Sequence, residues 1–397
     1  MLPLTSTSRR YPWGSPTAIP RALGMDPDGR ALAEAWFGAH PSSPAIVEPH
    51  DGAMTLTAYI DEDPTSALGA DVVARFGPRL PYLLKLIAAD SPLALQVHPG
   101  ADRAAAGYAA EEAAGIARDA PNRAFPDPFH KPELLYALTT LEALCGFRAP
   151  RRAAELFEGL DVPLARQVRE ILIEHPDAGG VVAAFRMLLD PATRPGSDAV
   201  REVATACAQR LWDGSPSARA DRTVVILGEE YPGDPAGVAS LLLNPVTLRP
   251  GEAVYIPVGT VHAYLSGMAV EVMAASDNEL RGGLTTKHMD VAGMLECMDQ
   301  VAAPPLRIAP ELFWGASRVF YAPVDDFELS VTTVDDGGSH PLPGRGPRVV
   351  LCLDGLVALN AGNGTLTLAR GQSAFVSAVD GPLSVVGSGT LVQADVP

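Results

Sequence analysis

The chain has 397 residues, of which 30 are basic and 47 acidic, and carries a formal net charge of −17 at pH 7. This acidic balance argues against nucleic acid or an anionic membrane surface as a partner. The length exceeds one ordinary hydrophobic core, so two or three domains are expected.

The sequence also limits the compartment. No run of about 20 apolar residues is present, and the N-terminal MLPLTSTSRRYPWG lacks the apolar core of a signal peptide. We therefore expect a cytoplasmic protein that neither spans nor binds a membrane. The four cysteines lie far apart without a C-x-x-C pair, which argues against a disulfide framework and a zinc–thiolate site.

The first part of the chain alternates between strand-like and helical patterns. Residues 1–60 contain short apolar runs broken by Pro and Gly, which favour strands and turns. Residues 64–77 and the Ala-rich residues 102–119 are predicted helices. Between them LPYLLKLIAADSPLALQVHPG predicts two strands. After the second helix HKPELLYALTTLEALCGF is a further apolar run.

The pattern changes between residues 150 and 214. Four segments there place apolar residues three and four apart and are bounded by Pro, Gly or Asp, which predicts an inserted helical domain. Strand-like runs resume at TVVILG and SLLLNPVTL, and MDVAGMLECMD is a predicted short helix. After residue 304 six apolar runs separated by Gly and Asp predict a second sandwich or barrel.

Residues 251–287 are the part of the chain most indicative of a site. They begin as G-x5-P-x-G-x-x-H, in which the glycines and proline shape a bend and His262 emerges in the next strand. This pattern resembles a motif of the cupin superfamily, although Ser266 stands where that motif usually has asparagine. Four ionisable residues follow, a density that a buried strand pair would not carry: Glu271, Asp277, Arg281 and Lys287.

Metal-binding side chains occur in three segments. Gln96 and His98 are two apart, so on a strand they face the same side. Glu133 and His262 could complete a set of one amide, one carboxylate and two imidazoles, which suits zinc or another divalent first-row ion. A lone histidine before a proline is more often a packed residue than a ligand, so the prediction depends on the four occurring together.

Lysine is rare in this chain. Of the 30 basic residues only Lys85, Lys131 and Lys287 are lysines, and the other 27 are arginines. Because the compact ammonium group suits chemistry and point-like phosphate contacts, we interpret these three as the positive groups of a pocket in an otherwise acidic protein.

Several longer segments together resemble the type I phosphomannose isomerases. They are LQVHPG, HKPELLYALTTLEALCGF, LLLNPVTLRPGEAVYIPVGTVHAYLSG and EVMAASDNELRGGLTTKHMDV, preceded by YPWGS and AWFGAHPSSP. The resemblance covers residues 10 to about 300 in the right order, and the C-terminal region is similar only in kind.

The resemblance implies a fold and a reaction. The expected fold is mainly β with an inserted α-helical domain, and contains two cupin-type jelly-roll barrels. The domains would be a catalytic cupin domain (1–149 with 215–303), a helical insertion (150–214) and a C-terminal cupin-like domain (304–397). The implied activity interconverts mannose 6-phosphate and fructose 6-phosphate by proton transfer between C2 and C1 in a monomer with one Zn²⁺ per chain, or another divalent metal.

The resemblance also implies residue roles. Gln96, His98, Glu133 and His262 would hold the metal, and Arg281 would be catalytic. The implied pocket contains further positions, of which three would bind substrate: Lys85, Tyr264 and Lys287. The choice of catalytic base stays open among four others: His130, Lys131, Glu271 and Asp277. The family commonly has serine two residues before the glutamine, where this chain has Ala94, which weakens the expected phosphate site.

The individual residues also admit plainer roles. Arg281 could form a salt bridge to Asp277 or Glu279, the base candidates could form a structural ion-pair network, and Tyr264 could be packing. Trp13 and Trp36 are interpreted as core residues. Two other functions remain open, an iron-dependent double-cupin oxygenase and a non-catalytic sugar-binding cupin.

Overall fold

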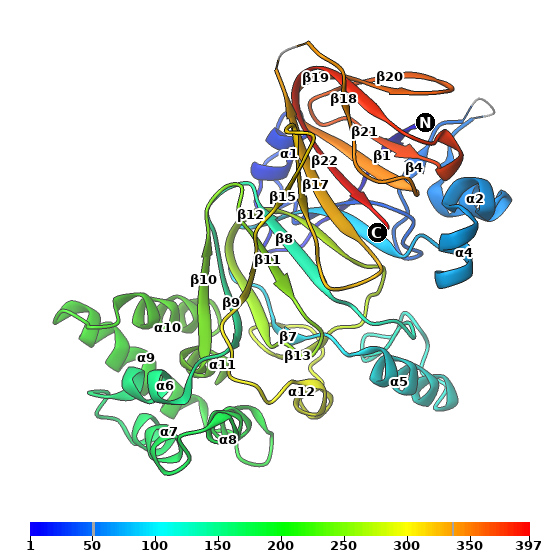
Figure 1. Ribbon diagram of the computed structural model, residues 1–397. Helices are drawn as coiled ribbons and strands as arrows, with labels where there is room; N and C mark the ends of the chain where they lie inside the picture. The colour runs from blue at the N-terminus through cyan, green and yellow to red at the C-terminus, as the bar shows by residue number, and fades with distance from the viewer. Residues whose placement is uncertain (50–51, 336) are drawn as a thin grey trace.

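In the computed structural model, which describes residues 1–49, 52–335 and 337–397, two antiparallel sheets of eleven strands each lie beside a block of helices (Figure 1). The fold is therefore a mixture of α and β structure with a helical middle region. The red and orange C-terminal strands form much of one sheet, and the green helices extend from the far end of the other (Figure 1).

The first sheet carries the segments that were predicted to hold the site. Its strands are β2 (Thr7–Arg9), β3 (Glu34–Phe37), β6 (Tyr82–Ala89), β7 (Leu95–Val97), β8 (Glu133–Ala137), β9 (Leu141–Phe147), β10 (Leu243–Leu248), β11 (Ala253–Ile256), β12 (His262–Ala274), β13 (Leu280–Gly283) and β14 (Leu306–Ile308). The main path runs β14-β11-β8-β12-β6-β3-β2, and β7, β9, β10 and β13 branch from it.

Strand β12 joins the two halves of this sheet. Its C-terminal part pairs with β6 and β8, so that Glu271 lies opposite both Lys85 and Leu135. Its N-terminal residue His262 pairs with Gln96 of β7 and with Cys145 of β9. A single long strand thus brings residues from distant segments to one place.

The second sheet combines the C-terminal strands with the N-terminus. Its strands are β1 (Leu2–Thr5), β4 (Ile46–Val47), β5 (Met54–Thr55), β15 (Glu311–Phe313), β16 (Ser317–Phe320), β17 (Glu328–Val334), β18 (His340–Pro341), β19 (Arg348–Ala361), β20 (Gly364–Ala369), β21 (Ser373–Val376) and β22 (Ser384–Asp395). The strand-rich character predicted after residue 304 is confirmed, although RVVLCLDG and LVALNAG form one continuous strand, β19.

A shared hydrophobic core holds the two sheets together. It contains Leu84 and Val272 from the first sheet and Val349 and Val392 from the second, all buried. At the same junction the Tyr82 hydroxyl lies 2.9 Å from the carbonyl oxygen of Ala394 in β22 and 2.9 Å from that of Pro347, just before β19. Burial of these alternating apolar residues fixes the register of the facing strands.

The helical block is longer than predicted. It consists of α6 (Pro150–Phe157), α7 (Pro163–Glu174), α8 (Ala178–Leu189), α9 (Ser197–Trp212), α10 (Ala218–Glu230), α11 (Ala236–Ala239) and the short 3-10 helix η1 (Ser240–Leu242). The prediction of a strand at TVVILG was wrong, because these residues lie inside α10, where Val224 and Leu227 pack into the core of the block. A short β-branched run does not by itself distinguish a strand from a buried helix.

The remaining helices lie around the sheets. They are α1 (Ala18–Ala22), α2 (Leu56–Glu62), α3 (Pro64–Leu68), α4 (Ala70–Phe76), α5 (Ala101–Ala113), α12 (Val291–Cys297) and the 3-10 helix η2 (Ala378–Asp380). The helix predicted over 64–77 is divided at Gly69, whose φ of 88° lies outside the helical range. The helix predicted over 102–119 ends at Ala113.

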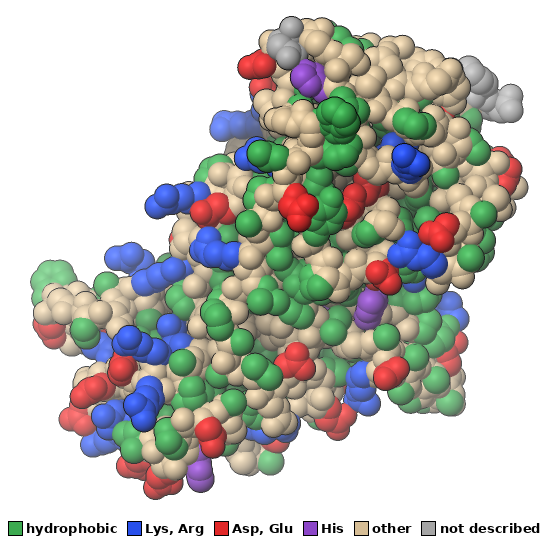
Figure 2. Space-filling model, viewed as in Figure 1, with side chains coloured by type: hydrophobic (Ala, Val, Ile, Leu, Met, Phe, Trp, Pro, Cys, Tyr) green, Lys and Arg blue, Asp and Glu red, His purple; other side chains and the backbone are tan. Residues whose placement is uncertain are grey.

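Among the described residues, no helix has both the length and the apolar character needed to cross a bilayer. Acidic and basic side chains are interspersed over the face in Figure 2.

Candidate metal centre and its cavity

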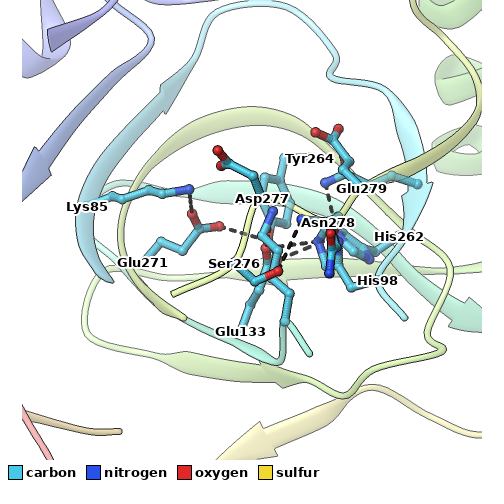
Figure 3. Close-up of polar contacts among 12 residues, drawn as sticks. Lys85, His98, Glu133, His262, Tyr264, Glu271, Ser276, Asp277, Asn278 and Glu279 are labelled. Carbon is cyan, nitrogen blue, oxygen red and sulfur yellow. Dashed lines mark hydrogen bonds and ion pairs between the residues drawn. The ribbon is translucent and has the colours of Figure 1, made fainter. Parts of the chain in front are cut away.

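Three buried side chains converge at the junction of β7, β8 and β12. His98, Glu133 and His262 each offer one ligand atom, and these atoms all lie within 4.8 Å of one another. Nε2 of His98 is 3.0 Å from Glu133 Oε1, and Nε2 of His262 is 3.6 Å from Glu133 Oε2. Figure 3 shows the two imidazoles and the carboxylate turned toward each other. This is the donor set expected for a zinc site.

The backbone fixes the orientation of both imidazoles. Nδ1 of His98 is 2.8 Å from the carbonyl oxygen of Asn278, and Nδ1 of His262 is 2.9 Å from that of Thr260. Since a carbonyl can only accept, each Nδ1 carries the proton, and in a neutral ring the lone pair then lies on Nε2. Nε2 of His98 is also a buried nitrogen without a hydrogen bond among the described residues. The imidazoles are therefore prepared to bind a cation.

Gln96 adjoins the same point. Its side-chain amide nitrogen lies 3.2 Å from Nε2 of His262. The backbones of Gln96 in β7 and His262 in β12 are paired in the sheet. Rotation of an amide exchanges its oxygen and nitrogen, which cannot be distinguished by position alone. The structure thus brings together all four residues that were predicted to hold a metal.

Charge at this centre favours binding to a cation. Burial lowers the pKa of His262 to about 4, which keeps its imidazole neutral at pH 7. Burial alone would raise the pKa of Glu133, but the neighbouring groups of His98 and Lys131 hold it well below its usual range. A neutral imidazole beside an ionised carboxylate is the protonation state that a metal requires.

A hydrogen-bonded group of buried residues extends from the centre. The hydroxyl of Tyr264 lies 2.6 Å from Glu133 Oε2 and 3.2 Å from Glu271 Oε1. The Lys85 ammonium is 3.1 Å from Glu271 Oε2, as drawn in Figure 3. Burial raises the pKa of Glu271, while the carboxylates of Glu271 and Glu34 outweigh burial and raise the pKa of Lys85. Tyr264 is more than packing, because its hydroxyl connects two carboxylates.

This group opens into a cavity of about 560 Å³. The volume is in the range that small-molecule sites occupy. Most of the predicted pocket residues line it: Lys85, Lys131, Tyr264, Glu271, Asp277, Arg281 and Lys287. Lys131 is also 3.5 Å from Glu133, which places its ammonium beside the metal centre.

His130 lies elsewhere. Its Nε2 is 3.0 Å from Asp326 in the second half of the chain, and the residue does not line the cavity. Although His130 and Lys131 are neighbours in the sequence, only Lys131 contributes to the cavity. The structure therefore does not bring His130 together with the other predicted site residues.

Arg281 and Asp277 both have partners. Arg281 forms a two-point ion pair with Glu279, in which Nε is 3.0 Å from Oε1. This pair lowers the pKa of Glu279 to about 2 despite its burial. Asp277 accepts a hydrogen bond of 3.0 Å from Ser42. The salt bridge foreseen as an alternative for Arg281 is present, and it holds the guanidinium at the cavity wall.

Several cavity residues were missed by sequence reasoning. Strands β2 and β3 supply Arg9 and Glu34, the segment after β2 supplies Tyr11, and the end of α10 supplies Glu230 and Tyr231. Glu34 could have been suspected, because a carboxylate within the apolar run AEAWF needs a reason. Trp13 and Trp36 were interpreted as core residues. Trp36 is buried against Leu83 and Met273, Trp13 packs against a buried cluster, and both also line the cavity.

Comparison with known proteins gives concordant results. The family described as phosphomannose isomerase type I, catalytic domain, matches residues 1–150, and the family described as mannose-6-phosphate isomerase, cupin domain, matches residues 317–396. Mannose-6-phosphate isomerase of Escherichia coli (strain K12) is 36% identical over 99% of both chains. Mannose-6-phosphate isomerase 1 of Arabidopsis thaliana is 30% identical, covering 94% of this chain and 89% of its own.

Solved structures are similar along the whole chain. A crystal structure of mannose 6-phosphate isomerase bound with zinc and yttrium has a TM-score of 0.89 and 33% identity, covering 100% of this chain and 99% of the other. A zinc-bound holo structure of mannose 6-phosphate isomerase has the same score, identity and coverage.

Proposed function

The chain belongs to the type I phosphomannose isomerase family, and from this membership we propose how its residues interconvert mannose 6-phosphate and fructose 6-phosphate. The observation that carries the proposal is the convergence of His98, Glu133 and His262 beside a cavity that fits a small molecule. The reaction is an aldose–ketose isomerisation without net oxidation. One proton moves between C2 and C1, and another moves between O2 and O1.

We assign one zinc ion to Gln96, His98, Glu133 and His262. The two imidazoles, each with Nδ1 held by a backbone carbonyl so that Nε2 faces the centre, and the ionised Glu133 support this assignment. Zinc bound there would supply a Lewis acid for the oxygens at C1 and C2 of the sugar. The hydroxyl of Tyr264 holds the Glu133 carboxylate, which is the kind of outer contact that orients a metal ligand.

For the proton transfer we favour Glu271 as the base. It lines the cavity, and burial raises the pKa of its carboxyl, which makes it a stronger base than an exposed glutamate. Lys85 and Tyr264 contact its two oxygens and keep it oriented. Asp277 and Lys131 remain candidates because they line the same cavity.

Arg281 is proposed to stabilise the negative charge that develops on the sugar oxygens. A guanidinium remains protonated at any working pH, so it offers a fixed positive charge. Its ion pair with Glu279 restricts its position, and this reduces the reorganisation that the reaction would otherwise require. Lys287 lies at the same cavity and is proposed to contact the substrate.

The fold-level proposals follow the same family. We propose that each sheet forms a cupin-type jelly-roll barrel and that the chain acts as a cytoplasmic monomer. The catalytic domain would combine residues 1–149, apart from β1, β4 and β5 of the second sheet, with the strands that follow the helical insertion. The helices α10, α11 and η1 argue for placing the end of that insertion near residue 242 instead of 214.

A coupled isomerase assay combined with metal analysis tests the function. The purified protein is expected to contain about one zinc per chain, to convert mannose 6-phosphate, and to lose turnover with a chelator and regain it with Zn²⁺. Oxygen consumption without sugar isomerisation would instead identify an oxygenase, and sugar binding without turnover would identify a binding protein.

The Arg281→Ala variant provides an independent check. Its side chain lies at the cavity wall and is not a metal ligand, so the zinc content should be unchanged while the rate falls. Loss of a charge-assisted contact to a developing oxyanion costs about 10²–10³ in kcat. An unchanged rate would remove Arg281 from the mechanism.

A further inference from the structure

The charge of the cavity as a whole does not favour a phosphate. Five basic and six acidic side chains line it, so the protein groups alone leave the cavity slightly negative. An anionic substrate must therefore be recognised by particular cations whose charge is not already balanced. The question is which of the five basic groups are free to do this.

Three of the five are balanced by carboxylates in contact with them. These pairs are Lys85 with Glu271, Lys131 with Glu133, and Arg281 with Glu279. The scarcity of lysine in the sequence suggested Lys85 and Lys131 as phosphate-binding groups. However, the Lys85 ammonium lies 3.1 Å from Glu271 and the Lys131 ammonium 3.5 Å from Glu133, and both carboxylates are buried. Binding a phosphate there would require these ion pairs to be weakened.

Arg9 and Lys287 are different. Within residues 1–49, 52–335 and 337–397, neither forms an ion pair with a carboxylate. Arg9 is the last residue of β2, and its guanidinium carbon lies 4.7 Å from the ring centroid of Trp36. Nε of Arg9 is buried and has no hydrogen bond among the described residues. The ammonium of Lys287 lies 4.3 Å from the ring centroid of Tyr11.

The aromatic contacts keep both cations in place without neutralising them. A ring face attracts a cation but leaves its N–H donors available. Burial lowers the pKa of Lys287, and the carboxylates of Glu279 and Glu34 offset this only in part. Repulsion from Arg281 and Arg9 lowers it further, so these positive groups lie close enough to affect one another. A dianion bound between them would relieve this repulsion.

We propose that Arg9 binds the phosphate group of the substrate and sets the preference for phosphorylated over free sugar. This inference deepens the proposed function and rests on it. A guanidinium offers planar N–H donors that match phosphate oxygens in pairs, and Arg9 lines the cavity without a carboxylate partner among the described residues. Ala94, which also lines the cavity, has no hydroxyl that could donate to a phosphate. Binding of the phosphate therefore depends more strongly on Arg9.

Steady-state kinetics of an Arg9→Gln variant test the proposal. The KM for mannose 6-phosphate should rise at least about tenfold, since a hydrogen bond to a charged group is lost. The kinetics with unphosphorylated mannose should be unchanged. Arg9→Lys, which keeps the charge but not the planar fork, should recover part of the loss.

Arg10→Gln is the matched control. Arg10 is the next residue, is exposed, and forms an ion pair of 3.0 Å with Asp28 outside the cavity. Its loss should affect neither sugar. Thermal unfolding of both variants shows whether the loss of the Trp36 contact has changed the fold.

Binding of inorganic phosphate separates this inference from the proposed function. Calorimetry should detect phosphate binding to the wild type and to Arg10→Gln, and weaker binding to Arg9→Gln, whether or not the protein turns over a sugar. Equal losses for phosphorylated and free sugar in Arg9→Gln would assign Arg9 a structural role through Trp36 and overturn the proposal, as would unchanged phosphate binding. Absence of any isomerase activity with intact, Arg9-dependent phosphate binding would overturn only the proposed function.

Discussion

Lys85 and Glu271 face each other across β6 and β12, with Nζ 3.1 Å from Oε2 and both side chains buried. A buried charge is costly unless it is paired, so each of these residues depends on the other. The pair lies between the hydrophobic interior of the first sheet and the cavity. It therefore affects both stability and chemistry.

We expect Lys85→Met to be strongly destabilising. The substitution leaves Glu271 as an unpaired buried carboxylate, which costs about 3–5 kcal/mol in the free energy of unfolding. Urea denaturation measures this loss. Arg152→Met is the control, because its pair with Glu155 is exposed and such pairs contribute about 0–1 kcal/mol. The double variant Lys85→Met/Glu271→Met should be more stable than Lys85→Met; equal or lower stability would contradict the dependence of the two charges on each other.

Tyr264→Phe should lower turnover while zinc stays bound. The tyrosine hydroxyl contacts Glu133 and Glu271, so its removal frees both carboxylates without removing a ligand. Loss of such an outer contact typically costs about 10–100-fold in activity or metal affinity. Zinc content and kcat, measured on the same preparation, check this. Phe327→Leu is the control. Phe327 is buried in the core shared by the two sheets and does not line the cavity, so this substitution should not change kcat. A Tyr264→Phe enzyme with wild-type kcat and zinc affinity would show that the hydroxyl is not needed.

Asp395 should make the stability of the protein depend on pH. Burial and repulsion from Glu328 raise its pKa well above the usual value of 3.8, whereas Arg348 lowers it. Above pH 3.8 the unfolded chain has released this proton and the folded chain still holds it, so stability is lost as pH rises toward the folded pKa. The slope approaches about 1.4 kcal/mol per pH unit.

Asp395→Asn removes this titration. The amide keeps the shape of the side chain, and its oxygen can still accept the hydrogen bond that Gln393 donates to Asp395. We expect the wild type to lose stability relative to the variant between pH 5 and pH 8 in urea denaturation. A difference between the two proteins that is independent of pH over this interval would show that Asp395 is ionised in the folded state.

Two glycines allow backbone strain to be separated from crowding. Gly251 and Gly267 both have positive φ, 91° and 110°. A Cβ at Gly251 would meet no atom closer than 3.8 Å, whereas one at Gly267 would lie 2.4 Å from the backbone oxygen of Thr140. Gly251→Ala should therefore cost only the left-handed conformation, about 1–2 kcal/mol. Gly267→Ala should cost about 1–3 kcal/mol more, because the backbone of the neighbouring turn must move. Equal unfolding free energies for the two variants would rule out the crowding.

The metal centre could be predicted because its residues lie in short motifs with fixed local geometry. Gln96 and His98 share one side of a strand by alternation, and the glycine and proline before His262 shape the bend that precedes it. Most strands and helices were likewise indicated by periodicity. One exception is TVVILG, whose apolar run suits a strand locally, while packing in the helical block made it part of α10.

The composition and local patterns determined an acidic chain with a helical middle region, a strand-rich C-terminus and four metal-binding side chains. Tertiary structure decided which charges are free: it balanced Lys85 and Lys131 with carboxylates from other segments, turned His130 toward Asp326, and brought the unpaired Arg9 to the cavity. The physical reason is that a charge is balanced by whatever lies within a few ångströms in space, and those neighbours come from strands that are far apart in the sequence.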